Sequence, residues 1–127
     1  MLEKHGWSVR DSWEVAWTPE TFRSYIQGSR AEFSCAKPSC VNLQNAWISD
    51  RTLCYLASGK PAVVQHTGAS RFLPEGEGLL RFRTIEDAAR CVESVASNYD
   101  AHARAAGPDQ IGEGIERGAH ATRTRSA

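Results

Sequence analysis

The sequence predicts an α/β fold in which helices cover a mainly parallel sheet. Helix-like and strand-like patterns alternate along the chain. Residues 62–64 form an uninterrupted apolar run, which is typical of a strand buried on both faces. Because helices between strands imply crossover connections, the strands that they join run parallel. We therefore expect a partial Rossmann-like fold of three layers.

The residue patterns in the first half of the chain predict a strand, a helix and a second strand. Residues 6–11 alternate apolar and polar side chains, as a short strand does. Thr18 caps a helix whose first position is Pro19, where proline is favoured. Residues 31–36 form the next strand. The polar connection 39–48 lacks regular signals, and such connections are often functional.

The second half continues the alternation. Ser49 caps a helix that stops at Gly59, and the strand at residues 62–64 follows. Residues 79–82 form a short strand, and Thr84 caps the last helix. The apolar stripe of that helix consists of Ile85, Ala88, Ala89, Val92, Val95, Ala96 and Tyr99.

Composition limits the classes of function. The chain has 127 residues, and its 15 basic and 15 acidic residues cancel, which argues against a nucleic-acid or membrane-surface binder. No apolar run is long enough for a membrane span, and no signal sequence is evident, so we expect a cytoplasmic protein. Residues 1–108 form one domain. Residues 109–127 lose all periodicity and are predicted to be disordered.

The cysteines indicate core packing rather than metal binding. Cys35, Cys40, Cys54 and Cys91 include no Cys-x-x-Cys pair. Together with the missing signal sequence, this favours reduced, buried thiols. Cys35, Cys40 and His66 lack an evident fourth zinc ligand, so no metal site is predicted.

Several short segments, taken in order, carry a family resemblance. They are GW (6–7), YIQGSRAEFSCAK (25–37), SDR (49–51), YLASGKPAVVQ (55–65), TG (67–68), LPEGEGLLRF (73–82) and ARAA (103–106). The chain resembles the C-terminal part of bacterial glycosyltransferases of the GT-B fold, of the broad group 1 class. The resemblance covers residues 6 to 106.

The resemblance implies a nucleotide-sugar-binding half-domain. GT-B enzymes have two Rossmann-like domains, of which the C-terminal one binds the nucleotide-diphosphate-sugar donor without a required metal. This chain corresponds to the last four strands of that domain, beginning near Trp7. The implied partner is the missing N-terminal acceptor domain, without which we expect no transferase activity. No catalytic residue and no cofactor are implied, since the donor is a substrate.

Three of the implied donor-binding residues would contact phosphate or ribose. Lys37 follows a strand, while Ser49 and Arg51 lie at a helix start, where free N–H groups favour phosphate. Each has a simpler interpretation. Lys37 is equally explained as a solvated charge, Ser49 as a helix cap, and Arg51 as the partner of Glu75 or Glu77.

The other four implied donor-binding residues, Gln65, His66, Thr67 and Gly68, would line the cleft after the central strand. Gly68 would allow close backbone approach. The simpler interpretations are that His66 is an exposed loop residue and that Gln65 satisfies backbone groups.

The chain departs from the family pattern at three positions. Ala46 and Cys54 occupy the positions of two glutamates found in many retaining enzymes, so a retaining outcome is not implied. His66 stands where we expect an aspartate, which removes a fixed negative charge.

The alternative function is a small α/β interaction module. Its exposed sheet edge would pair with a partner chain or a second copy.

Overall fold

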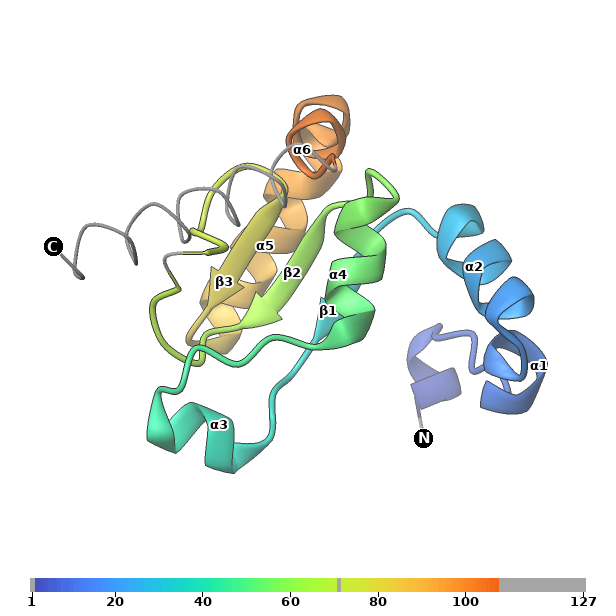
Figure 1. Cartoon of the computed structure of the whole chain (residues 1–127), viewed down its shortest axis with the longest axis horizontal. Coiled ribbons are helices and arrows are strands. Elements are labelled where there is room, and N and C mark those ends of the chain that lie inside the picture. Colours follow the sequence, from blue (N-terminus) through green and yellow to red (C-terminus); the bar gives the residue numbers. More distant parts are fainter. Residues whose placement is uncertain (1, 71, 108–127) are drawn as a thin grey trace, which may run out of the picture.

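The computed structural model describes residues 2–70 and 72–107 (Figure 1). The elements, in chain order, are η1 (Leu2–His5), α1 (Ser12–Ala16), α2 (Pro19–Gly28), β1 (Glu32–Ser34), α3 (Pro38–Leu43), α4 (Asp50–Ala57), β2 (Ala62–Gln65), β3 (Leu79–Phe82), α5 (Ile85–Ser97) and α6 (Tyr99–Ala105). The tail predicted to be disordered, residues 109–127, lies outside the described residues.

The sheet consists of three parallel strands in the order β1-β2-β3. Phe33 lies opposite Val63, which in turn lies opposite Leu80. In Figure 1, α4 covers one face of the sheet and α5 the other, while α6 lies beyond the amino ends of the strands. The prediction of an α/β fold with a parallel sheet is confirmed.

The predicted strand at residues 6–11 is wrong. This segment lies between η1 and α1, away from the sheet, so its alternating pattern has no strand to pair with (Figure 1). Trp7 and Val9 are exposed. Asp11 instead caps α1, accepting a hydrogen bond of 2.9 Å from the Trp13 N–H. The described residues therefore form three strands of one sheet, where the resemblance implied four.

The connection 39–48 is more ordered than predicted. It contains most of α3, which has proline in its first turn and is followed by its C-cap Gln44, a left-handed residue with φ 48°. Sequence patterns miss this helix because it buries no residue and so carries no apolar stripe.

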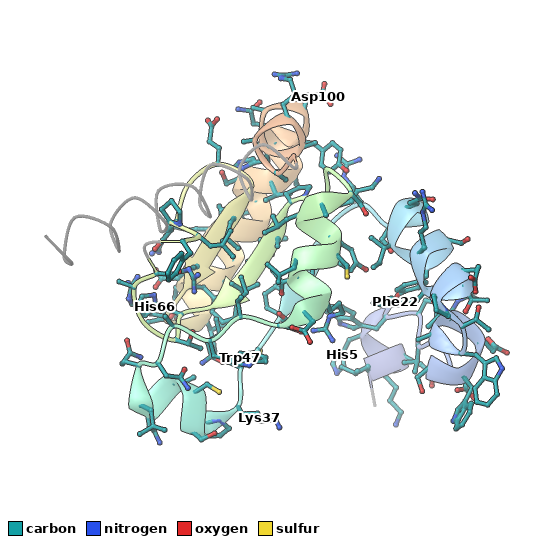
Figure 2. All side chains as sticks on the ribbon, viewed as in Figure 1. His5, Phe22, Lys37, Trp47, His66 and Asp100 are labelled. Atoms are coloured by element: carbon teal, nitrogen blue, oxygen red, sulfur yellow. The ribbon has the colours of Figure 1, made fainter. Side chains whose placement is uncertain are left out.

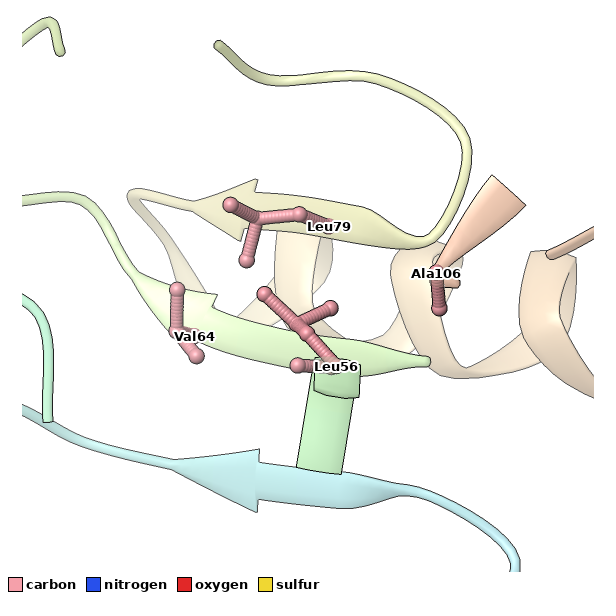
Figure 3. Close-up of a cluster of buried hydrophobic side chains, with 5 residues drawn as sticks. Leu56, Val64, Leu79 and Ala106 are labelled. Carbon is pink, nitrogen blue, oxygen red and sulfur yellow. The ribbon is translucent and has the colours of Figure 1, made fainter. Parts of the chain in front are cut away.

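The core lies on both faces of the sheet. Leu56 of α4 packs against one face, where the cluster comprises Leu56, Ala62, Val64, Leu79 and Ala106 (Figure 3). The cluster on the opposite face comprises Val63, Phe82 and Val95. Burying a leucine-sized side chain contributes about 1.5–3 kcal/mol, so these positions dominate the stability of the sheet.

The last helical segment divides at Asn98 into α5 and α6. Within the predicted apolar stripe, Val95 is buried and Ala88 packs against the sheet. Ile85, Ala89, Val92 and Ala96 are exposed, so only part of the predicted stripe packs against the sheet.

Two of the four thiols expected to be buried are exposed. Cys35 lies just beyond the end of β1, an edge strand. Cys54 lies on the outer side of α4, whose buried side is formed by Thr52, Tyr55 and Leu56. Cys40 and Cys91 are half-buried. The expectation of buried thiols is therefore wrong for Cys35 and Cys54.

None of the helices formed by residues 2–70 and 72–107 has the length and apolar character that crossing a bilayer requires. The same residues contain no cluster of three or more His, Cys, Asp or Glu side chains able to hold a metal ion.

Candidate functional site

A pocket opens at the carboxyl edge of the sheet. Its volume is about 250 Å³, and its lining consists of Val41, Gln44, Gln65, His66 and Arg83. These residues come from α3 and its C-cap, the end of β2 and the residue after β3. In open α/β sheets, ligands bind outside the carboxyl ends of the strands, which makes this pocket the candidate site.

His66 and Arg83 form the polar wall of the pocket. The Nη2 atom of Arg83 lies 3.2 Å from Nδ1 and 3.3 Å from Nε2 of His66. Burial lowers the pKa of His66, and the charges of Arg83 and Arg81 lower it further. The neutral imidazole is therefore favoured at pH 7, and in this form one ring nitrogen can accept from Arg83 while the other carries a proton.

Gln65 connects the pocket to the edge strand. Its Oε1 accepts a hydrogen bond of 3.1 Å from the backbone N–H of Ala36, just beyond β1. This contact matches the simpler interpretation, in which Gln65 satisfies a backbone group. Because the same side chain lines the pocket, its amide nitrogen can still serve a ligand.

Thr67 and Gly68 lie behind the pocket rather than in its lining. Thr67 is fully buried, and its hydroxyl donates to the carbonyl of Trp47 at 2.5 Å. Its own carbonyl accepts from the Ala46 N–H at 2.7 Å. A Cβ on Gly68 would collide with the backbone of Gln44. Both residues therefore hold the segment 44–47 against the sheet.

The held segment contains unusual backbone geometry. Gln44 and Ala46 have φ values of 48° and 59°, and among the described residues no other non-glycine has a positive φ. Such conformations persist only where the surroundings impose them, and they concentrate at functional sites. Here Gln44 takes the left-handed conformation of a helix C-cap, and the N–H of Ala46 is held by the Thr67 carbonyl, next to the pocket.

The remaining predicted residues lie outside the pocket lining. Ser49 caps α4, because its Oγ accepts from the Arg51 N–H at 3.3 Å. The Nε of Arg51 pairs at 2.7 Å with Glu32 of β1, rather than with Glu75 or Glu77. Glu32 is buried, so this pair neutralises a charge within the fold.

Lys37 is exposed at the start of α3 and lies apart from His66 (Figure 2). Its cap position provides no side-chain hydrogen bond to the helix. The structure thus brings together only Gln65 and His66 of the seven predicted residues as pocket lining.

Among the lining residues that the sequence prediction missed, Val41, Gln44 and Arg83, only Arg83 carries a charge. A signal for it existed, since Arg83 directly follows the strand-like residues 79–82, just as Lys37 follows an earlier strand. Parallel strands end at one edge of the sheet, so a cation directly after one of them can reach that region, as Arg83 does and Lys37 does not.

Comparisons of the chain with known protein families, curated proteins and solved structures found no match. What can be proposed about function therefore depends on the chemistry of the carboxyl edge. Its lining, as formed by the described residues, combines one guanidinium, one neutral imidazole and two amides without a carboxylate. Such a surface suits an anionic ligand that also carries hydroxyl groups.

Proposed function

We propose that this chain is the donor-binding portion of a nucleotide-sugar-dependent glycosyltransferase, and that it binds the donor diphosphate at the carboxyl edge of its sheet. The observation that carries the proposal is the pocket in which Arg83 and His66 meet Gln65. The ordered sequence segments that resemble GT-B enzymes supply the donor class.

Each polar group of the pocket has a role in this proposal. The planar guanidinium of Arg83 offers paired donors to phosphate oxygens. Neutral His66 contributes one N–H donor, while the amides of Gln44 and Gln65 match ribose or sugar hydroxyls.

The size of the pocket supports a site that a second domain completes. At about 250 Å³ it lies just below the roughly 300–1,000 Å³ typical of small-molecule pockets. It therefore accommodates the phosphates and leaves the sugar at its mouth, where an acceptor domain would close over it. The chain binds the donor, and the partner domain supplies the catalytic base.

Isothermal titration calorimetry with uridine, thymidine, guanosine and adenosine diphosphates tests the proposal. We expect one diphosphate to bind, and Arg83→Gln to weaken it about 10- to 100-fold, as expected for a hydrogen bond to a charged group. Arg10→Gln, at an exposed arginine outside the pocket lining, is the matched control. A folded sample that binds none of the four would overturn the proposal.

A second candidate function is association through β1. Among the described residues β1 pairs only with β2, so its outer edge is open. Phe33 on this strand is 47% exposed and stacks on Phe82 with ring centroids 5.3 Å apart. Open edges of this kind pair with other chains. Light scattering, which reports the oligomeric state, distinguishes the two candidate functions. A stable monomer that binds nucleotide excludes association as the primary function.

A further inference from the structure

A second pocket lies at the free edge of β3, beside the first. Its volume is about 280 Å³, and three arginines contribute to its wall: Arg81, Arg83 and Arg90. Arg83 belongs to both pockets, so the two share one guanidinium. Arg83 and Arg90 are exposed, so solvent screens their repulsion, whereas Arg81 is buried.

Arg81 is the most buried of the three. Its residue is only 5% exposed, and its Nη1 has no hydrogen-bond partner. Its Nη2 makes a long contact of 3.4 Å with the Leu73 carbonyl. A buried guanidinium normally has acceptors for its N–H groups, because an unpaired buried donor is costly. Burial accordingly lowers the pKa of Arg81.

The carboxylates in the wall compensate it only in part, because the charge of Glu75 raises the pKa of Arg81 but burial lowers it more. Asp87 accepts from the backbone N–H groups of Arg83 and Thr84, both at 3.3 Å, and it forms an ion pair with Arg90. That leaves exposed Glu75 as the carboxylate that acts on Arg81, and the three arginines of the wall outnumber its two carboxylates, so the pocket keeps an excess of positive charge.

We infer that this second pocket binds a phosphate dianion through Arg81 and Arg83, with Arg90 at its rim. The Arg81 side chain lines the pocket, and a phosphate bound there would neutralise a guanidinium whose Nη1 has no acceptor. Two guanidinium groups with paired donors match the several oxygens of one phosphate better than they match a carboxylate. The ligand is either inorganic phosphate or the phosphate of a monoester. This inference stands independently of the proposed donor site.

Calorimetric titration of the full chain with inorganic phosphate, and separately with glycerol 3-phosphate, tests the inference. We expect one equivalent to bind, and the tighter of the two ligands identifies the source of the phosphate. Two exposed charges of opposite sign provide the variants. Glu75→Gln should strengthen binding and Arg90→Gln should weaken it, each about fivefold for one partly screened charge.

Gln65→Ala distinguishes the two pockets, since Gln65 lines only the first and its hydrogen bond goes to Ala36 rather than to Arg83. It should leave phosphate binding unchanged and weaken any nucleotide diphosphate that binds. Phosphate binding that Gln65→Ala abolishes, and that neither charge variant alters, would assign the phosphate to the first pocket and overturn the inference. The absence of phosphate binding by the folded wild type would overturn it as well. If phosphate binds as expected but no nucleotide does, only the donor-site proposal fails.

Discussion

The two ends of the parallel sheet differ in kind. At the amino ends, the Gly78 N–H donates to Nδ1 of His102 at 3.3 Å, and the Gly78 carbonyl accepts from the Ala62 N–H at 2.8 Å. Ala62 and Ala106 are completely buried there. At the carboxyl ends, two pockets meet at Arg83, and the adjoining backbone is held in left-handed conformations.

This difference assigns stability to the amino ends of the sheet and binding to the carboxyl ends. The closed amino ends satisfy their backbone groups within the chain and stabilise the sheet. The carboxyl ends can therefore keep exposed polar groups, unusual φ values and an excess of positive charge, none of which favours folding by itself. Substitutions at the amino ends should change stability alone, whereas substitutions at the carboxyl ends should change binding first.

Gly78→Ala should have the largest effect on stability. Gly78 has φ 90°, and an added Cβ would lie 2.6 Å from the backbone nitrogen of Ala106. Backbone strain and overpacking together should cost roughly 2–6 kcal/mol of the free energy of unfolding, measured by urea denaturation. Nucleotide affinity, measured where the variant is folded, should stay at the wild-type value.

Gly76→Ala is the matched control for Gly78→Ala, two residues away in the same loop. An added Cβ at Gly76 meets nothing within 4 Å. A loss of stability equal to that of Gly78→Ala would show that the loop, rather than contact with α6, sets the cost.

His102→Ala should have the next largest effect. The substitution leaves the buried Gly78 N–H without its acceptor and removes the contact between Nε2 and Ser94 Oγ at 3.1 Å. We expect a loss of about 1–3 kcal/mol in urea denaturation, typical of an orphaned buried donor. His102→Asn, whose side-chain oxygen can accept from Gly78, should recover part of it. If both variants match the wild type, the amino ends are not held by this bond.

His66→Gln should have the smallest effect, visible only in the pH dependence of stability. The folded-state pKa of His66 lies below its ordinary value of 6.5. The stability from neutral His66 is therefore fully present above pH 6.5 and is lost as the pH falls through the folded-state pKa. Between pH 7.5 and pH 5, the melting temperature of the wild type should fall more than that of the variant.

The control for this pH experiment is His5→Gln, in the exposed helix η1. It removes a histidine without touching the carboxyl edge. Parallel pH profiles for the wild type and His66→Gln would contradict the role assigned to burial and to Arg83 in lowering the pKa of His66.

The sequence predicts the sheet and α4 well because their signals are local. Ser49 caps α4, and Gly59, with φ 66°, follows its end, as the residue types indicate. The alternation in residues 6–11 predicts a strand wrongly, because a strand needs a neighbouring strand to pair with. Sequence periodicity cannot show whether such a strand is present. The short helix α3 buries no residue and carries no periodicity to detect.

The candidate site is predictable only in part. Gln65 and His66 were identified because residues after a buried strand reach the carboxyl edge. Thr67 and Gly68 have the same sequence signature, yet their contacts with the segment 44–47 make them supports of the pocket. Arg51 lies outside the site because it pairs with Glu32, a buried carboxylate. That pairing depends on how α4 packs against the sheet. Such long-range contacts are absent from local patterns.

Mapping the nucleotide-binding surface by backbone amide chemical shifts tests the central claim most directly. The ¹⁵N-labelled chain is titrated with the tightest of the four nucleoside diphosphates. Binding at the carboxyl edge predicts the largest shifts at Gln65, His66 and Arg83, and no significant shifts at Gly78 or His102. Shifts centred on the amino ends, or none at millimolar nucleotide, would contradict the claim.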